Sequence, residues 1–106
     1  MTTRNKSNTI KFLEKIAGEE LTLASLIRSI RNSMELSQEK FGELLGVGRA
    51  YICDIEKGRT VVSAEQALIF AKKLGKSEVV FVQLALDEQC RRIGLDYLVQ
   101  LSKKAS

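Results

Sequence analysis

The sequence has no histidine and only two cysteines, Cys53 and Cys90. Without histidine it lacks the commonest general base, and two cysteines do not form a metal-ligand cluster of the usual spacing. No stretch approaches the ~20 consecutive apolar residues that span a bilayer, and the N-terminus has no apolar signal segment. We therefore expect no metal, no cofactor and no membrane association, and we expect a cytoplasmic protein.

An excess of charge is also largely missing. The formal net charge is +4 at pH 7, with a pI near 9.2. This balance suits a polyanionic partner, but many unrelated proteins share it. Residues 22–62 are nearly balanced in charge, so a basic face there would arise from the placement of the charges. A chain of 106 residues, 44% of them apolar, is long enough for one globular domain but too short for a large buried cleft.

Residues 37–58 have the pattern of two short helices separated by a glycine. Ser37 is suited to cap the first helix, and Gly46 and Gly58 stand where helices end with a residue at positive φ. So tight a connection predicts helices that cross steeply, and Gly42 removes a side chain at the crossing. The apolar residues at helical spacing are Phe41, Leu44 and Leu45 on the first helix and Ile52 and Ile55 on the second, with Val47 as a buried residue between them.

This motif resembles that of the Xre/Cro/C1 family of helix-turn-helix DNA-binding proteins. With the flanking helices, the resemblance covers roughly residues 22–86. It implies an all-α, lambda-repressor-like five-helix domain that binds double-stranded DNA. The alternative is a helical hairpin inside another kind of all-α domain. The residues that carry the resemblance are Leu36 to Glu39, Leu44 to Val47, Arg49, Tyr51, Ile52 and Ile55 to Arg59.

The chain is expected to have three parts. Residues 1–21 form a polar arm and a short extra helix from about residue 8 to residue 17. Residues 22–92 form the helix-turn-helix DNA-binding domain. Residues 93–106 form a C-terminal dimerisation segment and tail.

Two further helices are expected around the motif. Thr22 can cap a helix that runs to about Met34, with Leu23, Leu26, Ile27 and Ile30 on the same apolar face as Met34. Ser63 and Gln66 have the spacing of a capping box at the start of a later helix. Its core face is expected to contain Ala64, Ala67, Leu68, Ala71 and Leu74, with Lys72 and Lys73 on the solvated side.

Family resemblance assigns three residues of the second motif helix to base reading. Arg49 and Ala50 occupy its first turn, and Asp54 lies one turn further along. Arg49 could donate two hydrogen bonds to guanine, Ala50 could contact a thymine methyl group, and Asp54 could accept from cytosine. The alternatives for Asp54 are an electrostatic gate against wrong sequences and an ion pair with Arg49.

Phosphate contacts are expected on both sides of the base-reading turn. Gln38 matches the glutamine that contacts a phosphate in the family, with an ordinary polar residue of the first turn as the alternative. Tyr51 could donate to a phosphate, and core packing is an almost equal alternative. Lys57, Arg59 and Thr60 follow the second motif helix, which is the recognition helix in the family, at a place where family members contact the DNA phosphates. Gly48 replaces the usual Ser or Thr cap.

The resemblance also implies a structural ion pair between Arg31 and Glu56, which would hold the first domain helix to the recognition helix, with direct DNA contact by Arg31 as the weaker alternative. Glu35 stands where relatives often have glycine, so the turn that contains it is expected to be strained or differently shaped. Cys53 is interpreted as a small packing residue, with a redox sensor as the weaker alternative.

The C-terminal part predicts a homodimer. The helix from Ser77 is apolar almost all the way round, which suggests that a partner covers one face. Residues 97–101 alternate like a short strand, with a final helical turn as the alternative, and a lone strand needs a partner chain. The expected interface residues are Phe81, Val82, Leu86, Tyr97, Val99 and Leu101.

The preferred function is therefore a dimeric repressor that binds a palindromic operator. An antitoxin that binds a toxin protein and represses its own operon is the close alternative. A protein-interaction module that does not bind DNA is less favoured, since Gln38, Arg49 and Arg59 are all present. An enzyme ranks last, because no nucleophile, base and oxyanion donor converge in the sequence.

Overall fold

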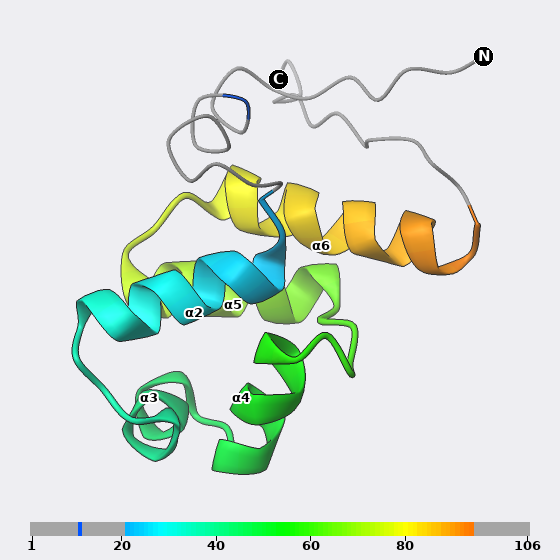
Figure 1. Ribbon diagram of the computed structural model, residues 1–106. Coiled ribbons are helices and arrows are strands. Elements are labelled where there is room, and N and C mark those ends of the chain that lie inside the picture. The colour runs from blue at the N-terminus through cyan, green and yellow to red at the C-terminus, as the bar shows by residue number, and fades with distance from the viewer. Residues whose placement is uncertain (1–10, 12–20, 95–106) are drawn as a thin grey trace.

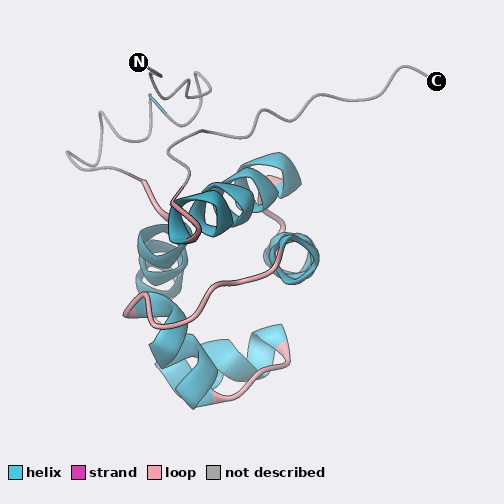
Figure 2. Cartoon of the chain, turned by 90° about the vertical axis from the view of Figure 1, so that its right-hand side faces the viewer, coloured by secondary structure: helices cyan, strands magenta, loops and turns pink. Residues whose placement is uncertain are grey.

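The computed structural model describes residue 11 and residues 21–94, and within the latter range the chain forms five helices. These are α2 (Leu23–Ser33), α3 (Gln38–Leu45), α4 (Arg49–Glu56), α5 (Ala64–Leu74) and α6 (Glu78–Arg92). Figure 2 shows only helices and loops in this part of the chain, so the predicted all-α class is confirmed. The predicted N-terminal helix and the predicted strand at 97–101 lie outside the described residues.

Short polar residues start the helices as the sequence predicts. The side chains of Thr22, Ser37, Ser63 and Ser77 each accept a hydrogen bond from the backbone amide three residues further along. Such a bond satisfies one of the amides that a helix start leaves without an intrahelical partner. Gly46 ends α3 with φ 77°, a left-handed conformation that glycine adopts without strain.

The core contains three fully buried phenylalanines, Phe41, Phe70 and Phe81. Phe70 was not among the residues expected to face the core from α5, although it is 0% exposed. Conversely, Leu44 and Met34 were expected on buried faces and are 42% and 43% exposed. The aliphatic core residues are Leu21, Leu23, Ile27, Ile30, Leu45, Ile52, Ile55, Val62, Ala67, Ala71, Leu84 and Ala85.

The helix-turn-helix unit projects from one side of the fold. In Figure 1, α2, α5 and α6 lie across the upper part, while α3 is seen nearly end-on below them and α4 runs steeply past it. A Cβ atom added to Gly42 would lie 2.6 Å from the carbonyl oxygen of Val47, closer than real Cβ contacts allow. The crossing of α3 and α4 therefore requires glycine at this position.

Helix α6 buries one face in its own chain, which corrects part of the predicted dimer interface. Phe81 is 1% exposed and belongs to the core, so its side chain is not available to a partner. Val82 and Leu86 are half-buried and keep some accessible surface. The most exposed apolar side chains of this region are Val79, at 56%, and Ile93, at 76%.

Candidate nucleic-acid interface

Helix α4 has one face in the core and the opposite face toward solvent. Ile52 and Ile55 are buried at 0% and 2% exposure. With 100° between successive residues, Ala50 and Lys57 lie opposite them, and both are exposed. Arg49, in the first turn, is also exposed. The start of α4 and its outer face are therefore free to enter a groove of DNA.

The first turn of α4 also keeps its backbone amides free of a capping side chain. Gly48 occupies the N-cap with extended backbone and provides no side-chain hydrogen bond. The amides of this turn and the Arg49 side chain are thus hydrogen-bond donors at the same helix end. Such an end favours an anionic or electron-rich partner.

The charges around α4 are not all equally available. Among residues 21–94, Arg49 and Lys57 have no acidic group within ion-pair distance, whereas Arg59 Nη1 lies 3.6 Å from Asp54 Oδ1. The pair of Asp54 with Arg49, considered from the sequence, is not formed. Asp54 partly neutralises Arg59 instead, and Arg49 and Lys57 remain the uncompensated cations.

Glu56 is the centre of a buried polar cluster that joins three helices. Nε and Nη2 of Arg31 donate to Oε2 and Oε1 of Glu56 at 2.6 and 3.0 Å. Nε2 of Gln38 donates to Oε1 at 3.2 Å, and Nη1 of Arg31 donates to the carbonyl oxygen of Leu36 at 3.0 Å. Glu56 is 5% exposed and the Arg31 side chain 17%. The structure thus contains the Arg31–Glu56 pair that the resemblance implies.

The cluster keeps Glu56 ionised despite its burial. Burial by itself raises the pKa of this carboxyl group, but the hydrogen bonds from Arg31 and Gln38 and the charges of Arg31 and Arg28 outweigh it and lower the pKa from its ordinary value. The hydrogen bond to Glu56 raises the pKa of Arg31. The carboxylate is compensated inside the protein, so it does not oppose DNA phosphates as an isolated negative charge.

Comparison with known proteins identifies the family. Residues 27–81 match the family model HTH_3, described as helix-turn-helix, and this segment spans more than half of the chain. The chain belongs to this family of Xre-type helix-turn-helix domains. It therefore contains a DNA-binding helix-turn-helix domain, and the family is one of non-enzymatic transcriptional regulators.

One relative supports the same assignment. A stretch of 55 residues is 40% identical to Control protein C.SmaI from Serratia marcescens. The match covers 52% of this chain and 66% of that protein, just under two thirds of its length. No solved structure gives a significant match.

In this helix-turn-helix domain, the expected phosphate-contacting residues occupy different environments. Lys57 and Arg59 are exposed. Gln38 is half-buried and gives one amide hydrogen to Glu56, so its second amide hydrogen is the one that could face a phosphate. Their contacts with DNA stay a prediction.

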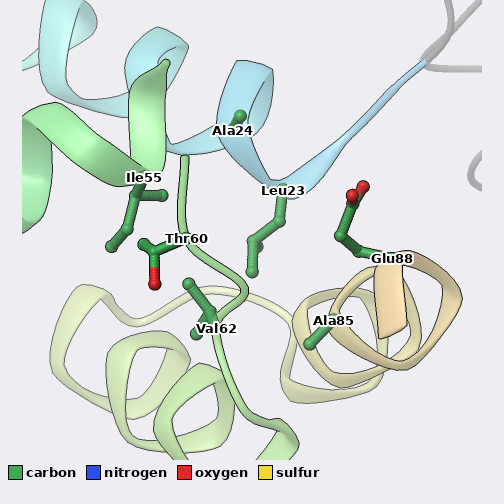
Figure 3. A pocket seen from close by; sticks show the side chains of 7 residues that line it. All are labelled: Leu23, Ala24, Ile55, Thr60, Val62, Ala85 and Glu88. Atoms are coloured by element: carbon green, nitrogen blue, oxygen red, sulfur yellow. The ribbon is translucent and has the colours of Figure 1, made fainter. Parts of the chain in front are cut away.

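Tyr51 and Thr60, like Gln38, are half-buried. The ring of Tyr51 packs edge-on against Phe70, with 6.5 Å between the ring centroids. This contact agrees with core packing, the alternative role considered for Tyr51. Thr60 is half-buried and lines a cavity of about 30 Å³ together with Leu23 and Val62 (Figure 3). Tyr51, Thr60 and Gln38 are thus all less exposed than Lys57 and Arg59.

Three long-range contacts at the edges of the helix-turn-helix unit were missed by sequence reasoning. Lys73 is exposed, as expected, and its Nζ also donates to the carbonyl oxygen of Leu45 at 3.1 Å. Arg28 of α2 and Arg92 of α6 donate to carbonyl oxygens at the end of α4 and in the turn after it. The partners are 28 to 34 residues apart in the chain, so no local pattern could reveal them.

In the part of the chain that the structure describes, no group of three or more His, Cys, Asp or Glu side chains could hold a metal ion. No helix among these residues has the length and apolar character needed to cross a membrane.

Proposed function

We propose that the protein is a dimeric repressor that binds a palindromic DNA operator, with the first turn of α4 in the major groove. The observation that carries this proposal is the uncompensated charge of Arg49 at the exposed start of α4. A guanidinium group in this place can donate two hydrogen bonds to guanine O6 and N7. Ala50, also exposed, would contact a neighbouring thymine methyl group.

The remaining contacts would position the domain and not select the sequence. Lys57 and Arg59 follow α4 and are exposed, and Gln38 lies at the start of α3. Contacts with phosphates set register and orientation on the duplex but carry no direct sequence information. Asp54 would accept from cytosine, which requires its carboxylate to turn from Arg59 to the base.

The dimer would form through the outer face of α6. A shallow groove of about 460 Å³ lies at the end of this helix and is lined by Val61, Leu86, Gln89, Cys90, Arg92 and Ile93. A second copy would cover this apolar surface, and two recognition helices would then bind half-sites about 10 base pairs apart or a multiple of this. Occupation of such an operator would block RNA polymerase.

A binding titration tests the function. Fluorescence anisotropy would follow binding to the duplex upstream of the protein's own gene and to a random duplex, each at two salt concentrations. We expect affinity for the upstream duplex tens of times higher than for random DNA, with a steep decrease as salt rises. Equal affinity for the two duplexes would contradict a sequence-specific repressor of its own gene.

A mass measurement tests the dimer. Ile93→Asp places a charge on the apolar groove without disturbing the core, because Ile93 is 76% exposed. Light scattering after size-exclusion chromatography should give a dimer for the wild type and a monomer for Ile93→Asp. A dimer of unchanged stability in Ile93→Asp would show that the groove is not the interface.

A further inference from the structure

An arginine at the C-terminal end of α6 contacts the turn that follows α4, the proposed recognition helix. Arg92, the last residue of α6, donates from Nη2 to the carbonyl oxygen of Gly58 at 2.5 Å. Its Nε also donates to Oε2 of Glu88 at 3.1 Å. The guanidinium group is therefore oriented by a carboxylate on its own helix and by the turn that it contacts.

The opposite side of the same peptide unit is also fixed. The carbonyl of Gly58 and the amide of Arg59 belong to one planar peptide group. The amide of Arg59 donates to the carbonyl oxygen of Asp54 at 2.8 Å, while Arg92 binds the carbonyl of Gly58. This peptide plane is thus held between α4 and α6.

Two exposed cations lie on either side of Gly58 in the sequence. Lys57 precedes Gly58 and Arg59 follows it, and Gly58 has φ 70°. The amide of Gly58 donates to the carbonyl oxygen of Ile55 at 3.0 Å, but glycine adopts many backbone conformations, so its carbonyl group could still turn at little steric cost. The bond from Arg92 opposes such a change and keeps both cations in one arrangement.

We propose that Arg92 is a positioning residue for DNA binding, which acts through Lys57 and Arg59 by fixing the peptide plane between Gly58 and Arg59. The inference rests on the proposed DNA-contacting role of these two cations. It also connects α6 with the DNA-binding surface, because Arg92 is among the residues that line the groove proposed as the dimer interface.

A double-mutant comparison separates positioning from direct contact. Arg92→Met removes the donors and keeps an apolar stem against the groove. We expect it to weaken binding to upstream and random duplexes alike, by roughly 5- to 10-fold, since phosphate contacts are not sequence-selective. In the background of Lys57→Ala and Arg59→Ala, the same change should have almost no further effect, because the groups that Arg92 positions are absent.

The matched control removes a cation that does not contact the turn. Lys72 is an exposed residue of α5, and Lys72→Met removes one positive charge from the same domain. Its small effect on affinity should be the same in both backgrounds. If Arg92→Met also has equal effects in both backgrounds, or has no effect in the wild-type background, the positioning role is wrong.

Two further measurements keep the outcomes distinct. Circular dichroism and thermal unfolding should show that Arg92→Met remains folded. If it does not, Arg92→Lys, which keeps the charge but not the planar two-point geometry, should lose affinity only in the background that retains Lys57 and Arg59. Failure of the wild type to prefer the upstream duplex would overturn the proposed function, whereas preserved wild-type preference with an ineffective Arg92→Met would overturn only the role of Arg92.

Discussion

The two halves of the described domain are held together differently. The interface of α5 and α6 relies on buried apolar side chains, including Phe70, Ala71 and Phe81. Helices α3 and α4 also pack on the apolar core, but a cluster of ionised and polar groups around Glu56 joins them to α2 as well.

This difference matters for the orientation of the recognition helix. Apolar packing is non-directional, whereas the two parallel hydrogen bonds between Arg31 and Glu56 tolerate little change in angle or distance. The net stabilisation by such a buried pair is small, because both groups lose hydration. We therefore interpret the Glu56 cluster mainly as a device that orients α4, and the α5–α6 interface mainly as a source of stability.

The largest expected loss of stability is at the apolar interface of α5 and α6. Phe81→Ala should lower the free energy of unfolding by about 3–5 kcal/mol, because it leaves a cavity in the core at a residue that is 1% exposed. Urea unfolding measures this loss. Val79→Ala on the same helix is the control, and we expect a change of about 0.5 kcal/mol or less because Val79 is 56% exposed. Similar losses for the two variants would contradict the placement of Phe81 in the core.

A smaller loss of stability, which depends on pH, is expected when the Glu56 cluster is changed. Glu56→Gln keeps the shape of the side chain but leaves Arg31 without its counter-charge, so it should cost about 2–3 kcal/mol at pH 7. Since the folded-state pKa of Glu56 is lowered, its contribution is fully present above the ordinary pKa of 4.5 and decreases as the pH falls through the folded-state value.

Urea unfolding at several pH values checks this expectation. The difference between wild type and Glu56→Gln should be constant near neutral pH and should shrink below about pH 4.5. The difference between wild type and Phe81→Ala should not follow this titration. A Glu56→Gln difference that is independent of pH down to pH 3 would mean that ionised Glu56 does not stabilise the fold.

The smallest effect is expected in the turn that joins α2 to α3. Glu35 has φ 55°, the only positive value for a non-glycine residue in the described part of the chain. Glu35→Gly should raise the free energy of unfolding by about 0.5–1 kcal/mol, as relief of the left-handed strain exceeds the entropy cost of glycine. Thermal unfolding measures this gain, and Glu35→Ala, which keeps the strain, should show none. A loss of stability in Glu35→Gly would show that the glutamate side chain contributes more than its strain costs.

Much of the fold could be predicted because its signals are local. The caps Thr22, Ser37 and Ser63 and the turn at Gly46 depend on residues a few positions apart, and the structure has them where the sequence predicts. The positive φ of Glu35 agrees with the expected strain in its turn.

The wrong predictions concern features that tertiary packing determines, such as which side chains are buried. A helix that is apolar on most sides does not reveal which side its own chain covers, so Phe81 was assigned to a partner although it lies in the core. Leu44 was assigned to the core and is exposed, because helical spacing alone does not show how wide the buried face of α3 is. The contacts of Gln38 with Glu56 and of Arg92 with Gly58 join residues 18 and 34 positions apart, and no local periodicity reports such a distance.

The decisive measurement compares Arg49→Ala with Lys57→Ala on upstream and random duplexes. If α4 reads bases through its first turn, Arg49→Ala should lose about 1–3 kcal/mol of binding free energy on the upstream duplex and much less on random DNA. Lys57→Ala should weaken binding to both duplexes alike. Equal losses on the two duplexes for Arg49→Ala would show that Arg49 contacts only the backbone and would contradict the proposed readout.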